Sequence, residues 1–333
     1  MIPKLDGVRV LVTGGAGFIG SHLVDALLAR GAEVRVLDNL STGSRSNLAR
    51  VQARIDFRLG DIRDPEACRE AADGVSYVFH QAALGSVPRS LEDPGTTIDV
   101  NVGGTARVLA AARDAGARRV VFASSSSVYG DSERLPKREG EEGRPLSPYA
   151  LSKQMDEELA GTFQRSFGME IVGLRYFNVY GPRQNPEGAY AAVIPRFFKA
   201  YLRGEAPTIF GDGRQSRDFT FVEDAVTANL LAAGADAGCC GRAYNVAGGR
   251  GTDLLELARL IGESVGAPRA PRHAAARSGD VRHSLADLSL SRASLGYSPE
   301  FDLPEGLPRS HRHYMESLAA TVAAATGQLP AAR

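Results

Sequence analysis

Tyr149 and Lys153 stand four residues apart, and a run of four serines at residues 124–127 precedes them in the chain. At this spacing on a helix, the positive ammonium lies next to the phenol and favours its anionic form. A phenolate can take a proton from a substrate hydroxyl, and a nearby serine hydroxyl can hold or relay that proton. Many exposed helices carry both residues without a chemical role, so the prediction of proton transfer depends on what surrounds the pair.

The elements that must position these residues alternate between strands and helices. Short apolar runs predict strands at residues 8–13, 33–38, 56–59, 77–80, 119–123 and 171–176. Amphipathic stretches predict helices at about residues 21–30, 101–115 and 149–167. Alternation of this kind predicts an α/β fold of the Rossmann type, with a doubly wound parallel sheet.

The second half of the chain has a different composition, because glycine, proline and polar residues separate the expected short helices after residue 181. We expect a smaller C-terminal α/β substrate lobe there. Strand-like runs at residues 219–222 and 243–246 indicate a return to the main sheet before a helix opens at Thr252. The expected division is a Rossmann domain at residues 1–176 with returning segments at about 219–247, a lobe at residues 177–218 and 248–320, and a frayed tail at residues 321–333.

Composition argues against several classes of function. The 333 residues carry 39 basic and 39 acidic side chains, so no overall field recruits nucleic acid or a membrane surface. Three cysteines give no disulfide framework, and His273 and His283 lack partners at metal-ligand spacing, so no metal is expected. The chain has no signal-peptide pattern and no apolar stretch of membrane-spanning length, which predicts a cytoplasmic location. His80 is interpreted as a partly buried structural residue at a strand end.

Gly14, Gly17 and Gly20 form a G-x-x-G-x-x-G motif between an expected strand and an expected helix. Such a loop permits a tight turn, lets the backbone approach a pyrophosphate and presents the amides of a helix N-terminus to it. Asp38 ends the next strand, where a carboxylate can accept hydrogen bonds from the adenosine ribose and favours NAD over NADP. The alternative role for Asp38 is a turn cap, and Asp61 suits an adenine contact or a cap about equally.

Five segments together resemble the extended short-chain dehydrogenase/reductase family, in particular its NAD-dependent nucleotide-sugar 4-epimerases. They are TGGAGFIG, HQAAL, ASSSSVYG, the Tyr-x-x-x-Lys pair and LRYFNVYGPRQ. The resemblance runs from the first strand to beyond residue 290. It implies a Rossmann domain that holds NAD, a smaller lobe that binds a UDP-sugar, and a homodimer formed through the helices that begin near Asn101 and Tyr149.

The resemblance also implies roles for individual residues. Tyr149 is the expected catalytic base, Lys153 binds the nicotinamide ribose, and Ser125 hydrogen-bonds the sugar 4-hydroxyl. From the motifs and the resemblance together, the residues expected to bind NAD are Gly14, Gly17, Phe18, Ile19, Gly20, Asp38, Asn39, Asp61, Ile62, Ala82, Ala83, Asn101, Tyr149, Lys153 and Tyr176. Those expected to bind the substrate are Ser86, Arg89, Ser126, Ser127, Asn178, Gln184, Ala192, Val193, Arg217, Arg277, Asp280 and Ser284.

The serine run narrows the expected reaction. Related dehydratases carry acidic residues after the catalytic serine or threonine, because elimination of water requires a further acid and base. Ser126 and Ser127 stand there in this chain, so we expect oxidation and re-reduction of one carbon, which inverts C4 of the sugar through a transient 4-keto intermediate. A dehydratase or net oxidoreductase of the same family is one alternative, and a non-catalytic NAD-binding protein is another.

Ser284 bears on which sugar is bound. The resemblance places it where epimerases restricted to UDP-glucose and UDP-galactose carry tyrosine, and the smaller serine leaves room for a 2-acetamido group. Arg217 and Arg277 are expected to bind the diphosphate, which suits planar guanidinium groups. The expected substrates are therefore UDP-N-acetylglucosamine and UDP-N-acetylgalactosamine, with UDP-glucose and UDP-galactose as a second pair. UDP-glucuronate is an alternative, since Arg183 or Arg89 could meet its carboxylate.

Overall fold

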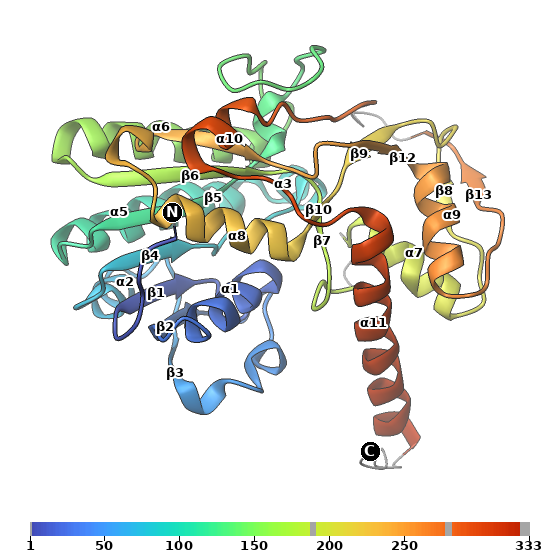
Figure 1. The fold of residues 1–333 in the computed structure, drawn as a ribbon, viewed down its shortest axis with the longest axis horizontal. Coiled ribbons are helices and arrows are strands. Elements are labelled where there is room, and N and C mark those ends of the chain that lie inside the picture. Colours follow the sequence, from blue (N-terminus) through green and yellow to red (C-terminus); the bar gives the residue numbers. More distant parts are fainter. Residues whose placement is uncertain (1, 187–190, 277–281, 327–333) are drawn as a thin grey trace.

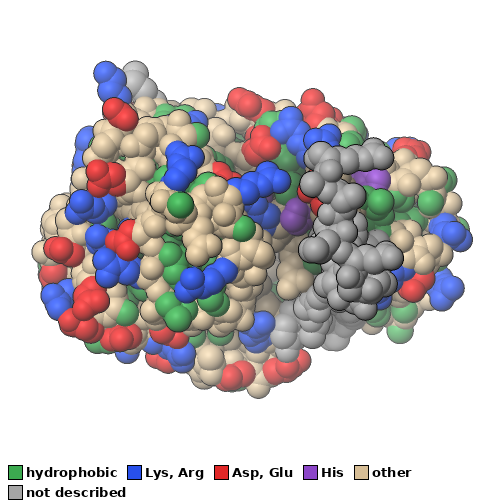
Figure 2. Space-filling model, turned by 90° about the horizontal axis from the view of Figure 1, so that it is seen from below, with side chains coloured by type: hydrophobic (Ala, Val, Ile, Leu, Met, Phe, Trp, Pro, Cys, Tyr) green, Lys and Arg blue, Asp and Glu red, His purple; other side chains and the backbone are tan. Residues whose placement is uncertain are grey.

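The structure is a computed structural model, and it describes residues 2–186, 191–276 and 282–326. A central sheet is covered by helices on both faces, and a smaller group of helices and short strands lies beside it (Figure 1). Figure 2 shows basic and acidic side chains interspersed over one face of the molecule, as the balanced composition leads one to expect.

The central sheet has seven parallel strands in the order β11-β6-β5-β4-β1-β2-β3. The winding of the chain reverses between β1 and β4, so the carboxyl ends of these two strands border a crevice. The Rossmann-type fold expected from the sequence is confirmed. The strands are β1 (Arg9–Thr13), β2 (Glu33–Asp38), β3 (Ile55–Leu59), β4 (Tyr77–His80), β5 (Arg119–Ser125), β6 (Glu170–Tyr176) and β11 (Arg242–Val246).

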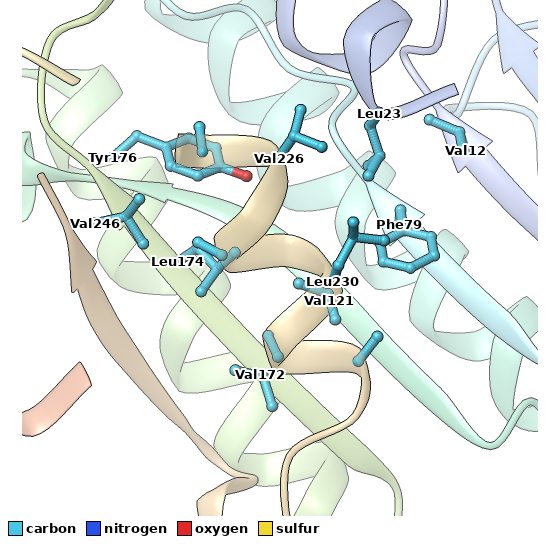
Figure 3. Close-up of a cluster of buried hydrophobic side chains, with 14 of the residues drawn as sticks. Val12, Leu23, Phe79, Val121, Val172, Leu174, Tyr176, Val226, Leu230 and Val246 are labelled. Atoms are coloured by element: carbon cyan, nitrogen blue, oxygen red, sulfur yellow. The ribbon is translucent and has the colours of Figure 1, made fainter. Parts of the chain in front are cut away.

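One face of the sheet packs against α1 (Phe18–Leu28) and α8 (Val222–Ala233), which also contact each other. Side chains from both helices meet alternate strand residues in one buried cluster, because successive residues of a strand point to opposite faces. Figure 3 shows members of this cluster, among them Leu23, Val226 and Leu230 from the helices and Val12, Phe79, Val121 and Leu174 from the strands.

The opposite face packs against three helices, α2 (Pro65–Ala72), α5 (Gly104–Asp114) and α6 (Pro148–Phe167). The strand residues that immediately precede those of the first cluster enter this second one. They include Leu11, Val78 and Val120. The near-continuous apolar runs that predicted these strands are therefore explained by burial on both faces.

Helix α6 positions the Tyr149 and Lys153 pair. The Ser147 hydroxyl caps it by accepting a hydrogen bond from the Ala150 amide, and Pro148 occupies its first turn. The helix ends at Gly168, which adopts the left-handed conformation. Tyr149 therefore lies in the first helical turn and Lys153 one turn further along.

Helix α5 begins later than the sequence predicts. Residues Asp99–Gly103 form a π-helical turn, η3, and α5 follows from Gly104. The wider turn carries Asn101, which is fully buried. The remaining short helices of this domain are α3 (Val87–Glu92), α4 (Pro94–Ile98), η1 (Arg45–Leu48), η2 (Gln52–Arg54), η4 (Ser126–Tyr129) and η5 (Ala237–Cys239).

The smaller lobe has its own apolar cluster, rich in aromatic side chains. Its strands form three two-stranded sheets, in which β10 pairs with β7, β12 with β9 and β13 with β8. The strands are β7 (Val179–Tyr180), β8 (Thr208–Phe210), β9 (Ser216–Asp218), β10 (Thr220–Phe221), β12 (Gly251–Asp253) and β13 (Arg272–Ala274). The helices are α7 (Val193–Leu202), α9 (Leu254–Ser264), α10 (Ser289–Leu295) and α11 (Leu303–Thr326).

The structure shows how the chain returns to the main sheet. Of the two strand-like runs, only β11 joins it, whereas β10 pairs with β7 and leads directly into α8. Thr252 lies in β12, and the helix expected there begins at Leu254. Helix α11 continues to Thr326, past the start of the expected tail, and residues 327–333 lie outside the described residues. Within the described residues, no helix has the length and apolar character needed to cross a membrane.

Candidate active site

A cleft of about 1010 Å³ opens where the carboxyl ends of the sheet strands face the smaller lobe. It brings together most of the residues that the sequence predicts for NAD and substrate. The predicted residues that line it are Gly14, Gly17, Phe18, Ile19, Gly20, Asp38, Asn39, Asp61, Ile62, Ala82, Ala83, Ser125, Ser126, Ser127, Tyr149, Lys153, Tyr176, Asn178, Gln184, Arg217 and Ser284.

The glycine loop is closed on its inner side and open toward the cleft. Gly14 has a φ of +69°, and a Cβ atom added there would lie 2.6 Å from the Ala82 nitrogen. Gly17 precedes the first turn of α1, whose leading amides have no side-chain cap. A Cβ atom on Gly17 would meet only the Gly14 carbonyl, at 3.1 Å. The backbone therefore presents uncapped amides at a helix N-terminus to the cleft, which fits a dinucleotide pyrophosphate.

Asp38 is both a turn cap and a cleft residue. Its carboxylate accepts hydrogen bonds from the Ala16 amide at 2.9 Å and the Leu40 amide at 2.8 Å. These bonds tie the end of β2 to the glycine loop and fix the direction of the carboxylate, which is 7 % exposed. The capping role that the sequence left as an alternative is thus present together with a position suited to ribose recognition.

Asp61 also combines the two roles considered for it. It lines the cleft, accepts a hydrogen bond from the Asn39 side chain at 2.8 Å and pairs with Arg63 at 2.8 Å. The Arg63 guanidinium holds the pKa of the Asp61 carboxyl well below its usual range. The group therefore carries a negative charge at neutral pH, where it can accept hydrogen bonds from a ligand.

Tyr149, Lys153 and Ser125 all line the cleft. A Cβ atom on Gly85, the residue that follows the HQAAL segment, would lie 4.0 Å from the Tyr149 hydroxyl, in ordinary van der Waals contact. The Lys153 ammonium donates to the Ala123 carbonyl and to Asp156 Oδ2, each at 3.0 Å. Burial by itself lowers the pKa of Lys153, but the negative charges of Asp156, Tyr149 and Glu157 together outweigh it, and the pKa is raised above its usual value.

The four serines have different environments. Ser124 donates to the Glu157 carboxylate at 2.5 Å and has a structural role. The Ser125 hydroxyl accepts a hydrogen bond from the Ser127 amide at 3.1 Å, which caps η4. The Ser127 hydroxyl is buried without a hydrogen-bond partner among the described residues, although it lines the cleft. Its hydrogen-bonding capacity is therefore available to a ligand.

Several predicted residues from the smaller lobe meet at one end of the cleft. Asn178 donates to the Asp218 carbonyl at 2.9 Å, and Gln184 donates to the Val179 carbonyl at 3.0 Å. The Ser284 amide donates to the Ser216 carbonyl at 3.1 Å, which ties this segment to β9. Ala192 and Val193 line an adjoining cavity of about 260 Å³, which shares Asn178, Gln184 and Arg217 with the cleft.

Some predicted residues lie elsewhere. Asn101 does not line the cleft, because its buried side chain accepts from the Leu84 amide at 2.8 Å and donates to Ser152 at 2.9 Å. Ser86 caps α3 by accepting from the Arg89 amide, and neither residue lines the cleft. These side chains shape the loop that borders the cleft. Arg277 and Asp280 lie outside the described residues.

Gln81 and Lys137 are among the cleft-lining residues that the sequence interpretation did not name. Gln81 lies in the HQAAL segment and forms a closed ring of hydrogen bonds with Asn229 and Tyr176. Its place in that segment was an available signal. Lys137 lines the cleft and forms an isolated backbone bridge with Ala286, far along the chain, which no local pattern indicates.

His80 and the other titratable groups give no sign of a metal site. Both ring nitrogens of His80 contact buried threonine hydroxyls, those of Thr13 at 2.6 Å and Thr105 at 3.0 Å. Burial lowers the pKa of His80 to about 3, so the ring is neutral. Across residues 2–186, 191–276 and 282–326, no group of three or more potential ligands could hold a metal ion.

Comparison with known proteins shows the family of this chain. Residues 10–247 match the model of the NAD dependent epimerase/dehydratase family. The UDP-glucose 4-epimerase of Mycolicibacterium smegmatis is 41% identical over 307 residues, which cover 91% of this chain and 97% of that protein.

Two solved structures are similar over nearly the whole chain. The UDP-N-acetylglucosamine 4-epimerase of Methanobrevibacter ruminantium M1, in complex with UDP-N-acetylmuramic acid, has a TM-score of 0.89 and 37% identity, and covers 94% of this chain and 100% of that one. The UDP-glucose 4-epimerase of Thermus thermophilus, in complex with NAD, has a TM-score of 0.82 and 38% identity, and covers 92% and 99%.

Proposed function

The chain belongs to the NAD dependent epimerase/dehydratase family and uses NAD, and we propose that it catalyses reversible inversion at C4 of UDP-N-acetylglucosamine and UDP-N-acetylgalactosamine. UDP-glucose and UDP-galactose are the second proposed pair. The observation that carries the proposal is the meeting of Tyr149, Lys153 and Ser125 in one cleft with the open glycine loop.

Each of these three residues has a proposed part in the chemistry. NAD, when bound, supplies a reversible acceptor for the hydride of the sugar C4. Tyr149 takes the proton from the 4-hydroxyl and later returns it, and Ser125 hydrogen-bonds that hydroxyl. The Lys153 ammonium stabilises the tyrosinate by its charge and binds the nicotinamide ribose with the N–H that it does not use inside the protein.

The groups around the serine run favour epimerisation over loss of water. Ser126 and Ser127 occupy the positions next to Ser125, and neither is an acid. The nearby carboxylate of Glu157 accepts hydrogen bonds from Arg175 at 2.7 and 2.9 Å and does not line the cleft. No general acid for elimination of water is thus supplied by this segment.

The sugar end of the cleft favours a substrate without a carboxylate. Arg183, which could have met glucuronate, pairs with Asp25 of α1 at 2.5 Å and does not line the cleft. Arg89 does not line it either. Ser284 does, and its short side chain supports space for a 2-acetamido group.

The test of this proposal is an assay of the purified protein with UDP-N-acetylglucosamine, UDP-N-acetylgalactosamine, UDP-glucose, UDP-galactose and UDP-glucuronate, with the products resolved by NMR. We expect interconversion of the acetylated pair, with no net formation of NADH. Failure with all five would contradict the substrate class. Conversion of UDP-glucuronate in preference to the others would contradict the choice of sugar, and a 4-keto-6-deoxy product would show a dehydratase.

We also propose that the protein is a homodimer. Leu151 and Met155 lie one turn apart on α6 and are 42% and 38% exposed, which supports packing of this helix against a second copy. Light scattering on the purified protein measures the mass directly. A monomer at micromolar concentration would contradict this part of the proposal.

A further inference from the structure

The hydrogen bonds of the Lys153 ammonium account for two of its three donors. One N–H points to the Ala123 carbonyl at the end of β5, and a second points to Asp156 Oδ2, both at 3.0 Å. Lys153 lines the cleft, although the residue as a whole is only 3% exposed. One donor therefore remains for the cleft, and its direction is set by the two internal acceptors.

Asp156 is an unusual residue for this position, because its side chain faces the interior of the domain. The residue is fully buried, and its second carboxylate oxygen has no hydrogen-bond partner among the described residues. An unpaired carboxylate of this kind is costly to bury, so its charge must be balanced by a nearby cation. The ion pair with Lys153 at 3.0 Å provides that balance.

The other groups that face Asp156 do not compete for this role. Glu157, its neighbour on α6, is paired with Arg175 at 2.7 Å. Burial raises the pKa of the Asp156 carboxyl, whereas the Lys153 ammonium and, from α5, the Thr105 side chain act to lower it. His80 of β4 lies behind Thr105 at 3.0 Å. His80 is neutral, as described above. Lys153 is therefore the cation that balances the Asp156 carboxylate.

We propose that Asp156 is a positioning residue for the reaction, which holds the Lys153 ammonium in place and partly offsets the charge that Lys153 presents to Tyr149. The inference rests on the proposed function, in which Lys153 and Tyr149 act on cofactor and substrate. It assigns two separable effects to one carboxylate. Its hydrogen bond fixes the direction of the third N–H, and its negative charge opposes ionisation of the phenol.

The two effects can be separated by substitution. Asp156→Asn keeps an oxygen that can accept from Lys153 but removes the charge, whereas Asp156→Ala removes both. Because a negative charge near the phenol disfavours tyrosinate, Asp156→Asn should move the acid limb of the kcat/KM profile to lower pH by about one unit. Asp156→Ala should lose kcat at least about tenfold and bind NAD more weakly, because a lysine left without its partner no longer has a fixed direction.

The matched control is Glu158→Gln, which removes one negative charge from an exposed position on the same helix. Its profile should overlay that of the wild type. Near-ultraviolet absorbance of tyrosinate, measured with Tyr149→Phe as the blank, gives a readout that does not depend on turnover. The tyrosinate titration of Asp156→Asn should move to lower pH by the same amount as the acid limb of its kcat/KM profile. Circular dichroism establishes that each variant is folded.

The outcomes are distinguishable from failure of the proposed function. Absence of epimerisation by the wild-type protein would contradict the function. In an active wild type, an Asp156→Asn profile and tyrosinate titration that overlay the wild-type curves would overturn the role of Asp156. An equal shift in Glu158→Gln would also overturn it, since the effect would then be one of overall charge. If Asp156→Ala does not fold, the kcat/KM profile and the tyrosinate titration of Asp156→Asn still test the role of Asp156.

Discussion

The cofactor half of the cleft and its sugar half are assembled from different kinds of chain segment. In the cofactor half, the glycine loop, Asp38 and Asp61 each lie at or just beyond the carboxyl end of a sheet strand. In the sugar half, Asn178, Gln184, Arg217 and Ser284 come from loops and short strands of the smaller lobe. Hydrogen bonds between remote backbone segments hold the second set together, such as that from the Ser284 amide to the Ser216 carbonyl.

Because the two halves are built from different kinds of segment, we expect substitutions in them to have different effects on binding and stability. The cofactor half is built on backbone conformation and close packing, so a small added atom should disturb it strongly. The sugar half presents side chains across a more open space, so substitutions there should change selectivity more than stability. Tyr149 lines the same cleft, and in the proposed function it serves both halves.

The largest expected effect is at that junction. Tyr149→Phe removes the proton acceptor and leaves the ring, so kcat should fall by about 10²- to 10⁴-fold while NAD stays bound. Steady-state assays and the NAD content of the purified protein measure the two quantities. Unimpaired turnover by Tyr149→Phe would contradict the proposed role of Tyr149 as the proton acceptor.

The next largest effect is expected in the cofactor half. Gly14→Ala places a methyl group 2.6 Å from the Ala82 nitrogen, so the loop must move and NAD should be lost on purification. The control is Gly116→Ala, which has a similar φ of +66° but no atom within 4 Å of the added methyl group. It should lose only the roughly 1 to 2 kcal/mol of a left-handed alanine in the free energy of unfolding. Equal NAD binding by both variants would show that close packing is not what makes this half sensitive.

The smallest effect is expected in the sugar half. Ser284→Tyr should lower kcat/KM for the N-acetylated substrates by about 10- to 100-fold relative to UDP-glucose, because the ring occupies the space proposed for the acetamido group. Ser284→Ala is the control and should retain both pairs. NAD content and thermal stability should hardly change in either variant. A uniform loss with all sugars would mean that Ser284 does not select between them.

How far the sequence could predict the site follows the same division. The glycine loop, Asp38 and the Tyr149 and Lys153 pair were predicted from short segments, because strand, turn and helix start are local. Asn101 was expected beside NAD, and a π-helical turn, which no local pattern indicated, carries its side chain into the interior. Ser86 was expected at the sugar but caps a short helix.

Long-range pairing accounts for most of what the sequence could not show. Lys137, which lines the cleft, forms a backbone bridge with Ala286, and β10 pairs with β7 instead of the main sheet. Both depend on contacts between segments more than forty residues apart. The ion pair of Arg183 with Asp25 belongs to the same class, because the two residues are far apart in the chain and no local pattern predicts their contact.

The ring formed by Gln81, Tyr176 and Asn229 has a consequence for how this protein can vary. Gln81 donates to Asn229 at 3.0 Å, Asn229 donates to the Tyr176 hydroxyl at 2.7 Å, and that hydroxyl donates back to Gln81 at 3.2 Å. Each member satisfies the next, so replacing one by an apolar residue breaks two of the three hydrogen bonds, although Asn229 keeps its bond to the Ala225 carbonyl at 2.8 Å. We therefore expect these three positions to covary in related sequences and in designed variants, although they lie in three distant parts of the chain.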